Sequence, residues 1–125
     1  MLPTKKISLA LIEFAEPLIN ELPPGYSKKD LETILRLAVC VWNSCVLDQW
    51  HKTNEHVAAV RKQIAKGQGL EVVVIEALIT RKIQLFGDDN RAINNESVVV
   101  KNGEFVVRAQ ARMDLEYIEV SGLAN

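Results

Sequence analysis

The stretch that decides the fold runs from Ser27 to Trp50 and reads SKKDLETILRLAVCVWNSCVLDQW. Ser27 and Asp30 resemble the capping box that opens a helix. At helical spacing one side of the segment is apolar, and its middle is apolar almost all round because further apolar residues lie opposite. The first group is Leu31, Ile34, Leu35, Ala38, Trp42, Cys45 and Val46, and the second is Leu37, Cys40 and Leu47. We therefore expect a long central helix that other elements surround.

A first helix is predicted before this segment. Apolar residues recur at spacings of three and four from Ile7 to Leu22, which is typical of a helix with one apolar stripe. Pro17 lies inside the stripe and removes a backbone donor, so we expect a kink or a restart near Glu16. The sequence PPG at 23–25 cannot continue a helix and predicts a turn.

Two more helices are predicted after the central one. Thr53 or Asn54 can cap a surface helix, which Gly67 and Gly69 end. A fourth helix then runs from about Leu70 to Phe86. Its apolar residues form two stripes, so we expect packed neighbours on two sides. One stripe is Leu70, Val73, Val74, Ala77, Leu78 and Leu85, and the other is Val72, Ile75, Ile79, Ile83 and Phe86.

The pattern changes to that of strands after a polar loop at 87–95. Asn-Gly at 102–103, between two alternating runs, is a strong signal for a two-residue hairpin turn. This turn pairs residues 97–101 with 104–108 and places one apolar face against the helices. That face comprises Val98, Val100, Phe105, Val107, Ala109 and Ala111. A third strand at 115–120 is an open alternative.

These elements predict one α+β domain over residues 1–125, with a helical part at 1–86 and a small antiparallel sheet at 97–120. A chain of 125 residues buries enough surface to fold without a metal ion or a disulfide. Cys40 and Cys45 point in different directions on a helix, which makes a bridge between them poor. We expect two reduced, buried thiols.

Charge and hydropathy argue against several partners. The 15 Lys and Arg balance 16 Asp and Glu for a net charge of -1, which argues against nucleic acid or an anionic membrane. The apolar-rich run at 37–47 is far shorter than the roughly 20 residues that span a bilayer. No cleavage site follows Lys5 and Lys6, so we expect a cytoplasmic protein. We also expect no cofactor.

Three cationic side chains lie near the polar loop. Arg81 sits within an apolar stripe of the fourth helix, where a desolvated guanidinium needs a carboxylate, carbonyl groups or a bound anion. The simpler interpretation is an internal ion pair, for instance to Asp88 or Asp89, or an arginine whose stem carries the charged group out to solvent. The functional alternative is an anion clamp made by Arg81, Lys82 and Arg91.

Three polar residues outside this group are candidate ligand contacts. Asn43 interrupts the most apolar stretch and needs hydrogen-bond partners if it is buried. A bond to loop backbone is the simpler interpretation, and a ligand contact is the alternative. Arg108 and Arg112 lie on the polar face of the hairpin, where they join the anion site if the loop folds over that face.

A polar cluster also falls between the second and third helices. It contains Asp48, His51, Glu55 and His56. The spacing does not match the His-Glu-x-x-His pattern of a zinc site, and a helix cap interrupts the run. We interpret the four as solvated junction residues and predict no metal site. A metal-dependent hydrolase that uses Asp48, His51 and His56 is the third of three functional hypotheses.

The first functional hypothesis is a non-enzymatic interaction or oligomerisation module, in the simplest case a homodimer. It rests on the apolar excess of the second and fourth helices and on the open edges of a two-stranded sheet. No phosphate-binding glycine loop or nucleophile elbow is present in the sequence, so no catalytic residue is assigned. The alternative is a small-anion or nucleotide-binding protein, with or without catalysis, that uses Arg81 and Arg91.

Overall fold

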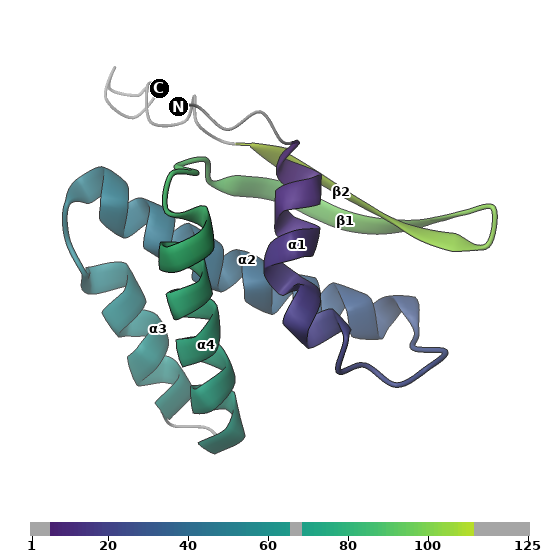
Figure 1. Ribbon diagram of the computed structural model, residues 1–125, viewed down its shortest axis with the longest axis horizontal. Helices are drawn as coiled ribbons and strands as arrows, with labels where there is room; N and C mark the ends of the chain where they lie inside the picture. The colour runs from purple at the N-terminus through teal and green to yellow at the C-terminus, as the bar shows by residue number, and fades with distance from the viewer. Residues whose placement is uncertain (1–5, 66–68, 112–125) are drawn as a thin grey trace.

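The computed structural model describes residues 6–65 and 69–111. Its elements are α1 (Ile7–Ile19), α2 (Lys28–His51), α3 (Glu55–Ala65), α4 (Gly69–Phe86), β1 (Ile93–Lys101) and β2 (Glu104–Ala111). The predicted α+β class, with helices before an antiparallel hairpin, is confirmed (Figure 1). The alternative third strand at 115–120 lies outside the described residues. None of the described helices combines the length and apolar character that a membrane span requires.

The central role predicted for α2 is confirmed. The helix starts at the predicted capping box, in which the Ser27 hydroxyl accepts from the Asp30 amide at 3.1 Å and the Asp30 carboxylate accepts from the Ser27 amide at 3.1 Å. It packs against α1, α3, α4 and β1. The indole of Trp42 is fully buried and meets the Phe14 ring edge-on, with 5.2 Å between centroids. The core therefore forms around the middle of α2.

One strip of α2 nevertheless faces solvent in the single chain. Both cysteines are free, as predicted, but the predicted burial of Cys40 is wrong, because its side chain is exposed and that of Cys45 is half-buried. Arg36, one turn before Cys40, is also exposed. The neighbouring elements cover the other sides of α2 and leave this strip open.

Helix α4 has packed neighbours on more than one side, as predicted, but its buried face takes in only part of each predicted stripe. Its buried residues are Ile75, Leu78, Ile79 and Lys82. The apolar side chains of Val73, Ile83 and Leu85 flank that face and are exposed. In Figure 1 α3 and α1 lie on different flanks of α4, with α2 behind it, so the outer parts of both predicted stripes have no neighbour among the described residues.

The hairpin has the predicted register. Residues 97–101 pair with 104–108, and the turn residues Asn102 and Gly103 have positive φ angles of 54° and 78°. Strand β1 starts earlier than predicted, at Ile93, because a bulge between Asn94 and Ser97 lets pairing continue past the irregularity. The polar loop is correspondingly shorter than 87–95.

The predicted inner face of the hairpin is buried only near the helices. Val98 is buried, and Val107 and Ala109 are half-buried. Val100, Phe105 and Ala111 are exposed, contrary to the prediction. The turn end of the hairpin projects beyond the helices (Figure 1), so Val100 and Phe105 lie past the edge of the core. Phe105 contacts Tyr26 there, with 5.7 Å between the ring centroids.

Candidate functional site

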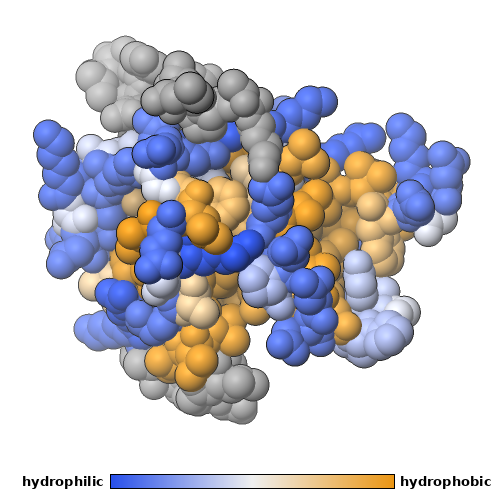
Figure 2. Space-filling model, viewed as in Figure 1, coloured by the Kyte–Doolittle hydropathy of each residue, from blue (hydrophilic) through white to orange (hydrophobic). Residues whose placement is uncertain are grey.

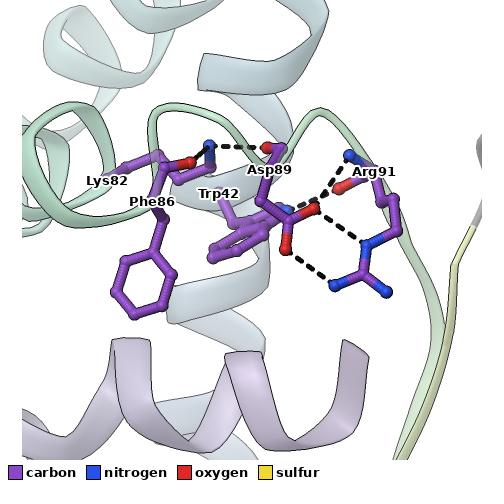
Figure 3. Close-up of polar contacts among 5 residues, drawn as sticks. All are labelled: Trp42, Lys82, Phe86, Asp89 and Arg91. Atoms are coloured by element: carbon purple, nitrogen blue, oxygen red, sulfur yellow. Dashed lines mark hydrogen bonds and ion pairs between the residues drawn. The ribbon is translucent and has the colours of Figure 1, made fainter. Parts of the chain in front are cut away.

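A buried lysine lies where α4 ends. The side chain of Lys82 is 2% exposed, and its ammonium donates to the carbonyl oxygens of Phe86 at 2.7 Å and Asp89 at 2.9 Å (Figure 3). The same ammonium lies 4.6 Å from the centroid of the Trp42 ring. Burial lowers the pKa of Lys82, although the charges of Asp89 and Cys45 act in the opposite direction. The ammonium thus supplies the donors that the last carbonyls of a helix lack.

Arg91 and Asp89 form a second charged pair beside this lysine. The guanidinium binds the carboxylate in a two-point arrangement, with Nε to Oδ1 at 2.9 Å and Nη2 to Oδ2 at 2.8 Å. These hydrogen bonds raise the pKa of Arg91. The carbonyl of Arg91 accepts from Nε1 of Trp42 at 2.7 Å (Figure 3). Arg91 is therefore fixed from both its side chain and its backbone.

Side chains of α2 hold the backbone of the loop and of β1. Asn43 donates to the carbonyl of Ile93 at 2.9 Å and accepts from its amide at 2.7 Å. Trp50 donates through Nε1 to the carbonyl of Asn90 at 2.8 Å. The simpler interpretation of Asn43 was a hydrogen bond to loop backbone. Asn43 does bind backbone, but its partner Ile93 is the first residue of strand β1. The two tryptophan donors were missed, because their acceptors lie about forty or more residues away in sequence.

Arg81 forms its hydrogen bonds with α1 rather than with the loop cluster. Its Nε donates to the carbonyl of Phe14 at 3.1 Å and its Nη2 to the carbonyl of Glu13 at 2.7 Å. The partners are thus main-chain oxygens of α1, and the predicted ion pair to Asp88 or Asp89 is wrong, because Asp89 binds Arg91 instead. Carbonyl groups are one of the three kinds of partner that the sequence analysis gives for a desolvated guanidinium at this position.

The predicted anion-site residues therefore fall in separate places. Lys82 and Arg91 lie together around Asp89, whereas Arg81 contacts α1. Arg108 is exposed on the hairpin opposite Ser97, and Arg112 lies outside the described residues. Anion binding by these residues stays a prediction.

The junction of α2 and α3 is organised by one carboxylate. Asp48 accepts from the amides of His56 at 2.8 Å and Val57 at 3.0 Å, and His56 Nδ1 lies 2.8 Å from the same carboxylate. Burial alone would raise the pKa of Asp48, but these hydrogen bonds outweigh it and lower the pKa. Asp48 is therefore a long-range cap of α3. No group of three or more metal-ligating residues occurs among the residues described.

A cavity of about 300 Å³ adjoins this junction and is lined in part by Cys45, Asp48 and Lys82. Burial raises the pKa of the Cys45 thiol, although the charge of Lys82 lowers it in part. A protonated thiol is a poor nucleophile. The lysine that lines the same cavity donates to two carbonyls. The cavity thus contains a thiol that burial keeps protonated and a lysine whose ammonium donates to two backbone carbonyls.

The larger candidate site is a groove of about 460 Å³ between α1 and α4, with α2 behind it. Its lining is mostly apolar and comprises Pro17, Leu18, Glu21, Leu22, Ile34, Val73, Val74, Ala77, Leu78 and Arg81. Figure 2 shows hydrophobic residues gathered on the face where α1 and α4 lie. Val73, at the rim, is 66% exposed.

The sequence did not predict the groove. Its position depends on which residues of each apolar stripe are covered by another helix. Leu18, Leu22, Val73 and Val74 were all identified as apolar stripe residues, and nothing in their spacing separates a core position from a groove wall. The groove forms only where α1, α2 and α4 come together, because all three helices contribute to its lining. Comparisons of this chain with protein-family models, curated proteins and solved structures find no match.

Proposed function

We propose that the protein is a non-enzymatic interaction module whose contact surface is the groove between α1 and α4. The observation that carries this proposal is an apolar groove of about 460 Å³ with an exposed apolar side chain, Val73, on its rim. Exposed apolar surface that is continuous and rimmed by polar groups is typical of protein contact sites. A groove bounded by two helices fits the apolar face of a third helix.

The partner proposed for this groove is a second copy of the chain, which makes the protein a homo-oligomer. Four of the exposed large hydrophobic residues lie on α4, namely Val72, Val73, Ile83 and Leu85. The helix that forms one groove wall is thus also the helix with most apolar surface to cover. A twofold contact places the same surface of both copies together, so the exposed apolar residues of this helix can be covered by the same helix of the other copy.

The chemistry of the polar sites supports binding rather than catalysis. Lys82 and Arg91 direct their charges at oxygens of the protein itself, and the Cys45 thiol has a raised pKa caused by burial. Catalytic groups need a pKa matched to proton transfer or nucleophilic attack, with access to a substrate. Lys82 and Arg91 instead join α4, the loop and α2.

Sedimentation equilibrium over the micromolar range tests this proposal. Val73→Asp should abolish self-association, because it introduces a charge into the apolar groove. Val100→Asp is the matched control, since Val100 is 59% exposed but lies at the far end of the hairpin. A wild-type chain that stays monomeric at high micromolar concentration would contradict self-association. Equal effects of the two substitutions would contradict the choice of the groove.

A further inference from the structure

The groove carries opposite charges at its two ends. Arg81 is fixed at one end by the carbonyls of Glu13 and Phe14. From there α1 and α4 run in opposite directions (Figure 1), and the groove is lined by Glu21, eight positions after Glu13, and by Val74, seven positions before Arg81. Arg81 lies seven positions after Val74 in α4, which corresponds to about 10 Å along the helix. The groove is thus cationic at one end, acidic at the other and apolar between.

Such a pattern is complementary to itself. A twofold axis through the middle of the groove exchanges its ends, and each cation then faces the acid of the other copy. The apolar middle, which contains Leu18, Ala77 and Leu78, faces its own copy. We propose that two chains dock groove to groove about this axis, with Arg81 of each copy paired to Glu21 of the other. This inference rests on the function proposed above and adds the orientation and the pairing.

Arg81 is suited to this contact because its own chain holds it in place. The two bonds to α1 carbonyls use part of a donor set of five N–H groups, and the rest can reach a carboxylate across an interface. Since the guanidinium is already ordered, the pair costs less side-chain entropy than one between two freely rotating groups. Glu21 is exposed in the single chain and lies just after α1.

The test is a double-mutant cycle on the dimer. Glu21→Arg should raise the dissociation constant by roughly tenfold or more, because two like-charge contacts with Arg81 replace two opposite-charge ones. Glu104→Arg is the matched control, since it makes the same charge change at an exposed site by the hairpin turn. It should leave the constant unchanged. In an Arg81→Gln background, Glu21→Arg should have little further effect. An equal effect in both backgrounds would overturn the pairing.

A second measurement keeps the test decisive if Arg81→Gln does not fold. The wild-type dimer should weaken as ionic strength rises, whereas the Glu21→Gln dimer should be much less sensitive to salt. Equal salt sensitivity would also overturn the pairing. If Val73→Asp dissociates the dimer but Glu21→Arg does not, the groove remains the contact surface and the orientation is wrong. If the wild type never associates, the proposed function itself fails.

Discussion

Arg81 donates through Nη2 to the carbonyl oxygen of Glu13 at 2.7 Å, and this is the carbonyl to which Pro17 has no N–H to offer. In a regular helix the amide at position 17 would bond to that oxygen. A side chain from α4 therefore replaces a helical hydrogen bond that a proline of α1 removes. This relation lets α1 continue through Pro17 to Ile19 and fixes one end of the groove.

The first prediction follows from this replacement. Arg81→Met should lower the free energy of unfolding by about 2 kcal/mol, which is in the range for hydrogen bonds to charged groups. The loss should be smaller in a Pro17→Ala background, because the alanine amide then bonds to Glu13. Urea unfolding of the four chains measures the coupling. Equal losses in both backgrounds would show that the arginine does not act through the proline gap.

The second prediction concerns the link between α2 and β1. Asn43→Ala should lower the free energy of unfolding by about 2 kcal/mol, because it leaves the amide and carbonyl of Ile93 without their partner. Ser44→Ala is a suitable control, since the Ser44 hydroxyl bonds to the carbonyl of Cys40 one turn earlier in the same helix. Its effect should stay within about 0.5 kcal/mol. Urea unfolding compares the two, and equal losses would contradict the prediction.

The third prediction is a pH dependence caused by Lys82. Burial lowers its pKa in the folded chain, so the unfolded chain binds more protons between that lowered pKa and the ordinary value for lysine. Stability must therefore rise with pH across this window. Lys82→Met has no such group, so the stability of the wild type relative to this variant should increase from neutral toward alkaline pH. If the difference in free energy of unfolding between the two chains does not change with pH, the lowered pKa of Lys82 is contradicted.

The fourth prediction concerns the cap of α3. Although burial opposes it, hydrogen bonding lowers the pKa of Asp48. Its stabilising effect is thus complete above the ordinary carboxyl pKa and is lost as pH falls through the lowered one. Asp48→Asn should cost about 2 kcal/mol at neutral pH, and the cost should shrink in acid. Asp88→Asn, at an exposed carboxylate, should show neither effect. Urea unfolding at several pH values provides the measurement.

The fifth prediction separates the two thiols. Cys40 is exposed, whereas burial raises the pKa of Cys45. A thiolate-specific reagent should therefore modify Cys40 quickly and Cys45 slowly, because the thiolate is the reactive form. Cys40→Ser should remove the fast phase, and Cys45→Ser should remove the slow one. Comparable rates for the two thiols in the native chain would contradict the difference in environment.

Local patterns in the sequence were sufficient for the elements and their order. The capping box at Ser27 predicted the start of α2, and Asn102-Gly103 predicted both the turn and the register of the hairpin. Each of these features depends on bonds between residues close in the chain or on backbone angles that few residues accept. An anion site depends instead on residues that are distant in the chain. The sequence could therefore identify cationic residues for such a site, but it could not show which of them lie close together.

The sequence by itself determined which side chains were apolar, where helices and strands begin and which residues face each other across the hairpin. Only the tertiary structure decided that Val73 stays exposed while Leu78 is buried, and that Arg81 binds α1 rather than a loop aspartate. The physical reason is that periodicity fixes the direction of a side chain relative to its own helix. Burial and pairing depend on a neighbour brought close from elsewhere in the chain, as α1 is to α4 across some seventy residues of sequence.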